Sequence, residues 1–65
     1  MPLYTFAYVL GGREWHRGTF DSGLPAQRFA EELSKLGPRQ PTELIQVWEG
    51  DDTDREPDAV VEREA

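Results

Sequence analysis

Few residues in this 65-residue sequence have the type and spacing that catalysis requires. The single histidine, His16, and the absence of cysteine leave no metal-ligand spacing for zinc and no thiol nucleophile. Asp21 and Ser22 are adjacent, but no recognisable motif places a base beside them. Asp51 and Asp52 could hold a hard cation only weakly, because the EF-hand pattern is missing. We therefore expect a non-enzymatic protein with no catalytic residue, no metal and no cofactor.

A second group of residues has the chemistry of a binding surface. Trp, Tyr and Arg are the residue types that contribute most to protein–protein interfaces. The candidate partner-binding residues are Tyr4, Phe6, Tyr8, Arg13, Trp15, Arg17 and Trp48. We expect them to form an open aromatic sheet face, edged by arginine, that contacts another protein.

The acidic residues form a third candidate surface near the end of the chain. Residues 1–48 hold five acids and five bases, whereas residues 49–65 hold eight acids and two bases and so carry the whole net charge of −6. This composition predicts a folded domain over residues 1–49 and a flexible acidic tail over 50–65, in which residues 58–65 form at most a frayed helical turn. The candidate acidic residues of the tail are Asp51, Asp52, Asp54, Glu56 and Asp58.

The elements that position these residues are indicated by turn and helix-end signals. Gly11-Gly12 supplies the positive φ angles of a two-residue hairpin turn, and Pro25 suits the first turn of a helix that Gly37-Pro38 ends. The expected elements are strands over 3–10 and 13–20, a helix over 25–36, and a third strand over 42–49.

The order of these elements predicts an α+β fold, a ββαβ domain with a three-stranded antiparallel or mixed sheet. A right-handed strand–helix–strand connection that skips one position places the third strand beside the first, in the order 2-1-3. One helix covers one face of such a sheet, and a disordered acidic tail follows. The other face is then left to solvent or to a partner.

Two assignments of the covered face are equally compatible with the sequence. Pairing Leu10 with Arg13 places Tyr8 opposite Trp15 and Phe6 opposite Arg17. In the first assignment the helix covers the small side chains around Ala7, and the aromatic residues are open. In the second, the aromatic residues lie under the helix, and the opposite face, with His16, Glu14 and Thr5, lies outside. Either way, some apolar area stays exposed, as at sites of protein contact or self-association.

The leading functional hypothesis is a protein–protein interaction module, an adaptor or inhibitor of the kind that phages and mobile elements encode. The alternative is an acidic mimic of nucleic acid whose tail inhibits a nucleic-acid-binding protein. Direct nucleic-acid binding is disfavoured, because a chain of net charge −6 repels phosphate. A homodimer through the aromatic face and pairing of an edge strand with another chain remain open. The sequence contains no candidate membrane span or signal segment, so we expect a cytoplasmic protein.

Pro2 resembles the N-terminal proline of the small tautomerase family, whose chains are of similar length and whose proline amine, once Met1 is removed, acts as a base. The resemblance covers Pro2 and chain length alone. That family runs strand, long helix, strand, whereas here a hairpin precedes the helix, so we transfer no activity.

Overall fold

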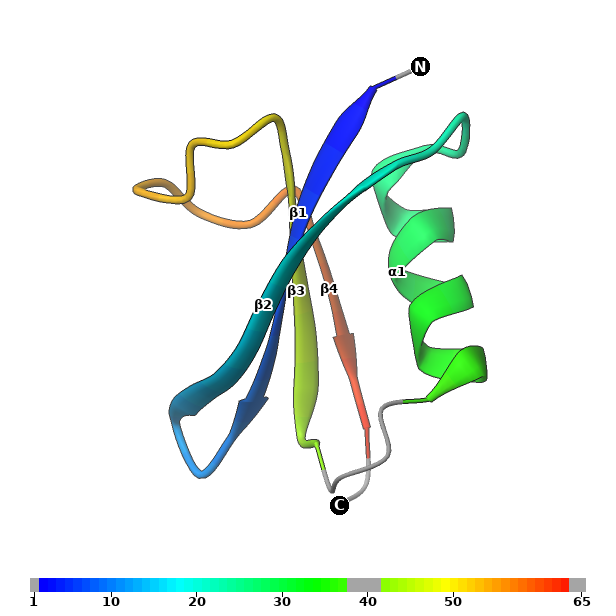
Figure 1. The fold of residues 1–65 in the computed structure, drawn as a ribbon. Coiled ribbons are helices and arrows are strands. Elements are labelled where there is room, and N and C mark those ends of the chain that lie inside the picture. Colours follow the sequence, from blue (N-terminus) through cyan, green and yellow to red (C-terminus); the bar gives the residue numbers. More distant parts are fainter. Residues whose placement is uncertain (1, 38–41, 64–65) are drawn as a thin grey trace.

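The computed structural model describes residues 2–37 and 42–63, which form one sheet and one helix. The elements are β1 (Leu3–Leu10), β2 (Arg13–Asp21), α1 (Ala26–Leu36), β3 (Leu44–Glu49) and β4 (Ala59–Glu62). All neighbouring strands are antiparallel, in the order β2-β1-β3-β4 (Figure 1). The α+β class, the single helix and the 2-1-3 order of the first three strands are thus confirmed. Pro38 and the rest of the expected loop before β3 lie outside the described residues.

The expectation of three strands followed by a disordered tail is wrong, because β4 adds a fourth strand to the sheet. Asp58 N–H donates to the Val47 carbonyl at 2.8 Å and Arg63 N–H donates to the Glu43 carbonyl at 2.6 Å, so the pairing with β3 extends past both ends of β4. Ala59 is 5% exposed and belongs to the core. Within the predicted frayed helical turn over 58–65, residues 59–62 therefore form a strand instead.

A β-bulge in β2 changes the expected register of the hairpin. Leu10 pairs with Arg13 as predicted, and Gly11 and Gly12 take φ angles of 62° and 75° in the turn. The register then shifts, so that Trp15 has no partner on β1 and Tyr8 lies opposite His16. A β-bulge places two residues of one strand opposite one residue of its neighbour. Relative to a regular pairing, the side chains beyond the bulge therefore lie on the other face of the sheet. The predicted pairing of Tyr8 with Trp15 is therefore wrong.

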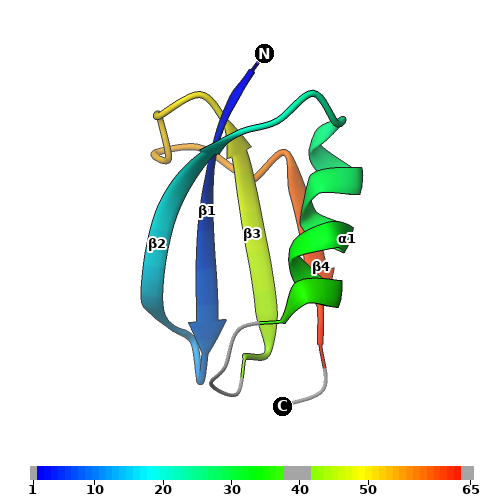
Figure 2. The same ribbon diagram turned by 45° about the vertical axis from the view of Figure 1, so that its right-hand side comes forward.

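The helix lies over one half of the sheet. It packs against β3 and β4, and Figure 2 shows β1 and β2 extending beyond it. Its last turn ends at Gly37, where φ is 70° and the N–H donates to the Leu33 carbonyl. The core between the helix and the sheet contains Tyr4, Phe29, Ala30, Ile45, Val47 and Ala59, with Phe6, Tyr8, Ala26, Leu33 and Val61 packed around it.

The structure thus corresponds to the second assignment of the covered face, in which the aromatic residues of β1 lie on the helix side. Because of the bulge, His16 also lies on the helix side, opposite Tyr8, rather than outside with Thr5. The loop of residues 50–58, which we call the acidic loop, lies on the other face of the sheet (Figure 1). The helix and the acidic loop therefore cover opposite faces.

Candidate functional site

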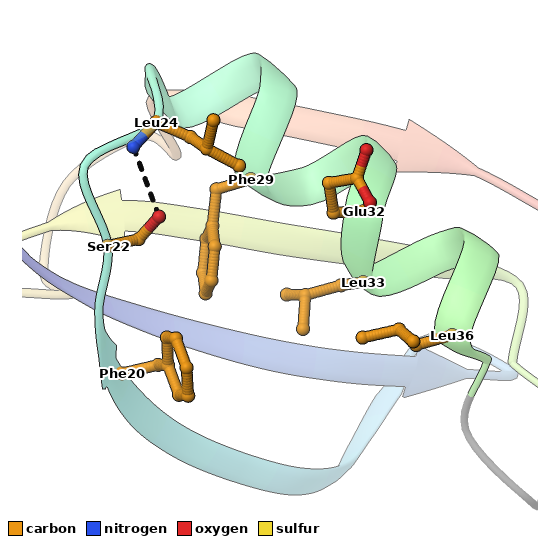
Figure 3. A pocket seen from close by; sticks show the side chains of 7 residues that line it. All are labelled: Phe20, Ser22, Leu24, Phe29, Glu32, Leu33 and Leu36. Atoms are coloured by element: carbon orange, nitrogen blue, oxygen red, sulfur yellow. Dashed lines mark hydrogen bonds between the residues drawn. The ribbon is translucent and has the colours of Figure 1, made fainter.

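An apolar groove lies between the helix and the end of β2 (Figure 3). Its volume is about 300 Å³, and its lining consists of Phe20, Ser22, Leu24, Phe29, Glu32, Leu33 and Leu36. Phe20 is 59% exposed and Leu36 is 83% exposed. With Leu24, which is 38% exposed, three large apolar side chains of the lining thus remain in contact with water, an arrangement typical of a protein contact site.

Phe29 forms the buried wall of the groove. Its ring stacks on Tyr4 at 5.0 Å between centroids and on Phe20 at 5.9 Å. At the helix N-terminal end, the Leu24 N–H donates to the Ser22 hydroxyl at 3.1 Å, and the Tyr4 hydroxyl donates to the Leu24 carbonyl at 2.6 Å. These bonds fix the turn that leads from β2 into the helix, so the groove is a preformed feature of the fold.

Next to the groove, β1 and β2 present a set of rings on the helix side of the sheet that the helix covers only in part, through contacts such as Phe6 with Phe29. We call Phe6, Tyr8, Trp15, His16 and Phe20 the open aromatic surface. Tyr8 is its centre, with ring centroids 5.4 Å from Phe6 and from Trp15 and 5.6 Å from His16. These rings pack against one another and form a partly exposed apolar surface.

Partial burial has electrostatic and hydrogen-bonding consequences within the open aromatic surface. Burial raises the pKa of Tyr8, and the charge of Arg63 acts in the opposite direction, so the phenol stays protonated at neutral pH. The Trp15 indole N–H is buried and has no acceptor among residues 2–37 and 42–63. Such an unpaired donor costs about 1–3 kcal/mol relative to a satisfied one.

The predicted partner-binding residues do not share one open face. Tyr4 is 3% exposed and lies in the core, so it offers no contact area to a partner. Phe6, Tyr8 and Trp15 belong to the open aromatic surface, and Arg13 lies exposed at the start of β2. The remaining two residues, Arg17 and Trp48, lie on the opposite face of the sheet.

On that opposite face, Trp48 anchors the acidic loop. It is 5% exposed, and its indole N–H donates to the Arg55 carbonyl at 2.7 Å. The guanidinium of Arg17 lies 5.9 Å from the centroid of the Trp48 ring and donates to the Thr53 hydroxyl at 2.8 Å and to the Glu14 carboxylate at 2.8 and 2.9 Å. Arg17 and Trp48 thus hold the loop to the sheet. Trp48 is buried, whereas the Arg17 side chain stays partly exposed on β2.

The acidic loop has a defined conformation. The Asp58 carboxylate accepts hydrogen bonds from the Glu49 N–H at 2.6 Å and from the Arg55 guanidinium at 2.8 and 2.9 Å. The bond from Arg55, followed by that from the Glu49 N–H, holds the pKa of Asp58 below its ordinary value. Of the five predicted tail acids, Asp58 is therefore engaged within the fold. Asp52 accepts a hydrogen bond from the Asp54 N–H at 3.0 Å. The four acids other than Asp58 are all exposed: Asp51, Asp52, Asp54 and Glu56.

The sequence analysis missed the groove itself, above all Phe20, Leu24 and Leu36. Apolar residues at helical spacing are usually buried, so the spacing of Phe29, Leu33 and Leu36 did not mark Leu36 as exposed. The available signal was the breadth of the sheet. One helix is too narrow to cover even the three strands expected from the sequence, so apolar residues at its edge stay exposed.

Other kinds of site have little support in the part of the chain that the structure describes. Within residues 2–37 and 42–63 there is no cluster of three or more His, Asp or Glu side chains able to bind a metal ion. The same residues include no helix with the length and apolar character of a membrane span. Comparisons with family models, with curated proteins and with solved structures found no match.

Proposed function

We propose that this chain is a non-enzymatic protein–protein interaction module, an adaptor or inhibitor that occupies a surface of its partner. The observation that carries the proposal is the groove of about 300 Å³ with Phe20 and Leu36 exposed at its rim. Together with the open aromatic surface, it supplies the aromatic and aliphatic contact area around which interface hot spots form. The proposal keeps the cytoplasmic location expected from the sequence.

The chemistry of the groove suggests what the partner presents. Its apolar lining suits an aliphatic or aromatic side chain. Among the described residues, Glu32 is the one charged member of the lining, and it lies 3.5 Å from the Lys35 ammonium at an exposed position. The whole chain has a net charge of −6, which steers a positively charged partner toward it. We therefore propose that the partner inserts an apolar side chain flanked by Lys or Arg.

The second candidate function is inhibition of a nucleic-acid-binding protein by mimicry of phosphate. The observation that favours it is the acidic loop, whose conformation is set by the bonds of Trp48, Arg55 and Asp58 while Asp51, Asp52, Asp54 and Glu56 remain exposed. A loop held in this way presents its carboxylates at lower entropic cost than a free tail. Binding through it would weaken strongly with salt, because exposed charges are screened.

A matched set of variants separates the two candidates. Each chain is immobilised and exposed to a nuclease-treated lysate of the source organism, and the retained proteins are identified. The chains compared are wild type, Leu36→Ser, Leu3→Ser and a quadruple loop variant (D51N, D52N, D54N, E56Q). Leu3 is a suitable control, because it is 38% exposed and lies on β1, away from the groove.

The groove proposal expects a protein that the wild type, Leu3→Ser and the loop variant all retain and that Leu36→Ser loses. Loss with the loop variant alone, together with elution at moderate salt, would support the nucleic-acid mimic instead. Equal retention by wild type and Leu36→Ser would contradict the groove as the contact site.

A further inference from the structure

Among residues 2–37 and 42–63, no strand neighbours the outer edge of β2. Ser22 N–H donates to the Pro2 carbonyl at 3.0 Å, which makes this pair a hydrogen-bonded one. Hydrogen-bonded and non-hydrogen-bonded pairs alternate along an antiparallel ladder. In the observed register, Asp21, Thr19 and Arg17 therefore stand in non-hydrogen-bonded pairs with β1. Their backbone N–H and C=O groups point outward, toward the free edge.

We propose that this edge pairs with the same edge of a second copy of the chain, antiparallel and centred on Thr19. Thr19 then faces Thr19 of the second copy, and Arg17 faces Asp21 of the second copy. The two-fold symmetry repeats the Arg–Asp pair on the other side of the centre. Each chain therefore contributes one acid and one base to a self-complementary edge.

The charges select this register among the possible ones. Asp21 is exposed and has no hydrogen-bond or ion-pair partner among residues 2–37 and 42–63. Arg17 uses three of its N–H groups on Glu14 and Thr53, and a guanidinium has five, so donors remain for a second carboxylate. Centring the pairing on Arg17 would instead place two arginines opposite each other, and like charges in cross-strand pairs are destabilising.

The helix side of the same register is complementary in shape. It places Phe20 of one copy opposite Gly18 of the other. Gly18 offers no side chain, and the Phe6 ring lies over it, since an added Cβ would meet Phe6 Cζ at 2.7 Å. Phe20, 59% exposed in the single chain, would therefore pack against Phe6 of the second copy and become buried.

The rest of the fold leaves this edge accessible from the helix side. The helix packs against β3 and β4 (Figure 2) and meets β2 near its end, where Phe29 stacks on Phe20. The bulge at Trp15 disturbs only the hairpin end of β2, so the pairing uses its regular part from Arg17 to Asp21. The dimer joins two four-stranded sheets into one and places both open aromatic surfaces on the same side.

The dimer goes beyond the proposed function and does not depend on it. The two share Phe20, which lines the groove and is buried in the dimer, so Leu36 is the rim residue that the dimer leaves exposed. Leu36 lies on the helix and outside the β2 edge, so Leu36→Ser leaves the dimer intact whatever it does to partner binding. Conversely, loss of the dimer does not remove the groove.

Sedimentation of the full chain at low and high micromolar concentration tests the proposal. Thr19→Pro removes an outward N–H that the monomer does not use, as tolerated on edge strands, and blocks the pairing. Asp21→Arg and Arg17→Asp each place like charges opposite each other in the homodimer, whereas a mixture of the two restores both opposite-charge pairs. Glu31→Arg is the control, because it makes the same charge change as Asp21→Arg on the exposed side of the helix. Circular dichroism verifies that each variant is folded.

The expected result is a concentration-dependent dimer for wild type and Glu31→Arg, and dissociation constants at least tenfold higher for Thr19→Pro and for each single charge variant. The mixture of Asp21→Arg and Arg17→Asp should dimerise again. A wild-type monomer at high micromolar concentration would overturn the proposal. So would a dimer that is insensitive to Thr19→Pro and to the charge changes.

Discussion

Replacement of Trp48 by phenylalanine tests whether the acidic loop is part of the folded structure. Trp48 is 5% exposed, and its indole N–H donates to the Arg55 carbonyl at 2.7 Å. Phenylalanine keeps an aromatic ring at this position but cannot donate the bond. The loop between Gly50 and Asp58 would then lose its bond to the Trp48 side chain.

The expected loss of stability follows from two contributions. The lost hydrogen bond contributes about 1 kcal/mol. The two indole carbons that phenylalanine lacks contribute about 1.5 kcal/mol at roughly 0.8 kcal/mol per buried carbon. Together they give about 2.5 kcal/mol, which corresponds to a decrease in Tm of about 10–20 °C for a domain of this size.

Trp15→Phe is the matched control, because the Trp15 indole N–H has no acceptor among the described residues and its removal breaks no hydrogen bond. We expect Trp15→Phe to cost less than about 1 kcal/mol. Urea denaturation followed by far-ultraviolet circular dichroism measures both free energies of unfolding. If Trp48→Phe and Trp15→Phe are equally stable, the reasoning about the loop is refuted.

Three further predictions concern the fold. Gly50→Ala should lower the free energy of unfolding by about 1–2 kcal/mol, because φ is 83° at this position and alanine is strained there. No atom lies within 4 Å of the added Cβ, so backbone strain is the cause and not a steric clash. Urea denaturation measures the free energy of unfolding. The pKa of Asp58 is lower in the folded chain than its ordinary value of about 3.9 in the unfolded chain, so the ionised Asp58 stabilises the fold at pH values above about 3.9. This stabilisation is lost as the pH falls through the pKa of Asp58 in the folded chain. Between neutral and acidic pH, the free energy of unfolding of Asp58→Asn should therefore decrease less than that of wild type. Phe29→Ala should cost about 3–5 kcal/mol and leave the chain largely unfolded by circular dichroism, whereas Leu36→Ala, at an exposed position, should change stability by less than about 0.5 kcal/mol.

The sequence predicted the elements with local signals and the sheet order that follows from them. Gly11-Gly12 marked the hairpin, and Pro25 and Gly37 marked the helix ends. The bulge at Trp15 left no such mark, because an aromatic residue fits a regular strand and a bulged one equally well. Its one-residue shift moved His16 and Phe20 to the helix side.

The fourth strand could not be predicted because its signal is short and lies within an acidic segment. Three apolar residues, Ala59 to Val61, do not specify a strand on their own. The strand forms because Ala59 finds a place in the core beneath the helix and because the Arg55–Asp58 pair sets the preceding turn. Both conditions depend on tertiary contacts that composition does not reveal.

The central claim is that the groove between the helix and β2 contacts another protein. The most direct measurement is the affinity of the captured partner for wild type, Leu36→Ser and Leu3→Ser by isothermal titration calorimetry. Burial of a leucine side chain contributes about 1.5–3 kcal/mol, so Leu36→Ser should weaken binding by at least about tenfold while Leu3→Ser leaves it unchanged. Equal affinities for Leu36→Ser and wild type would contradict the claim.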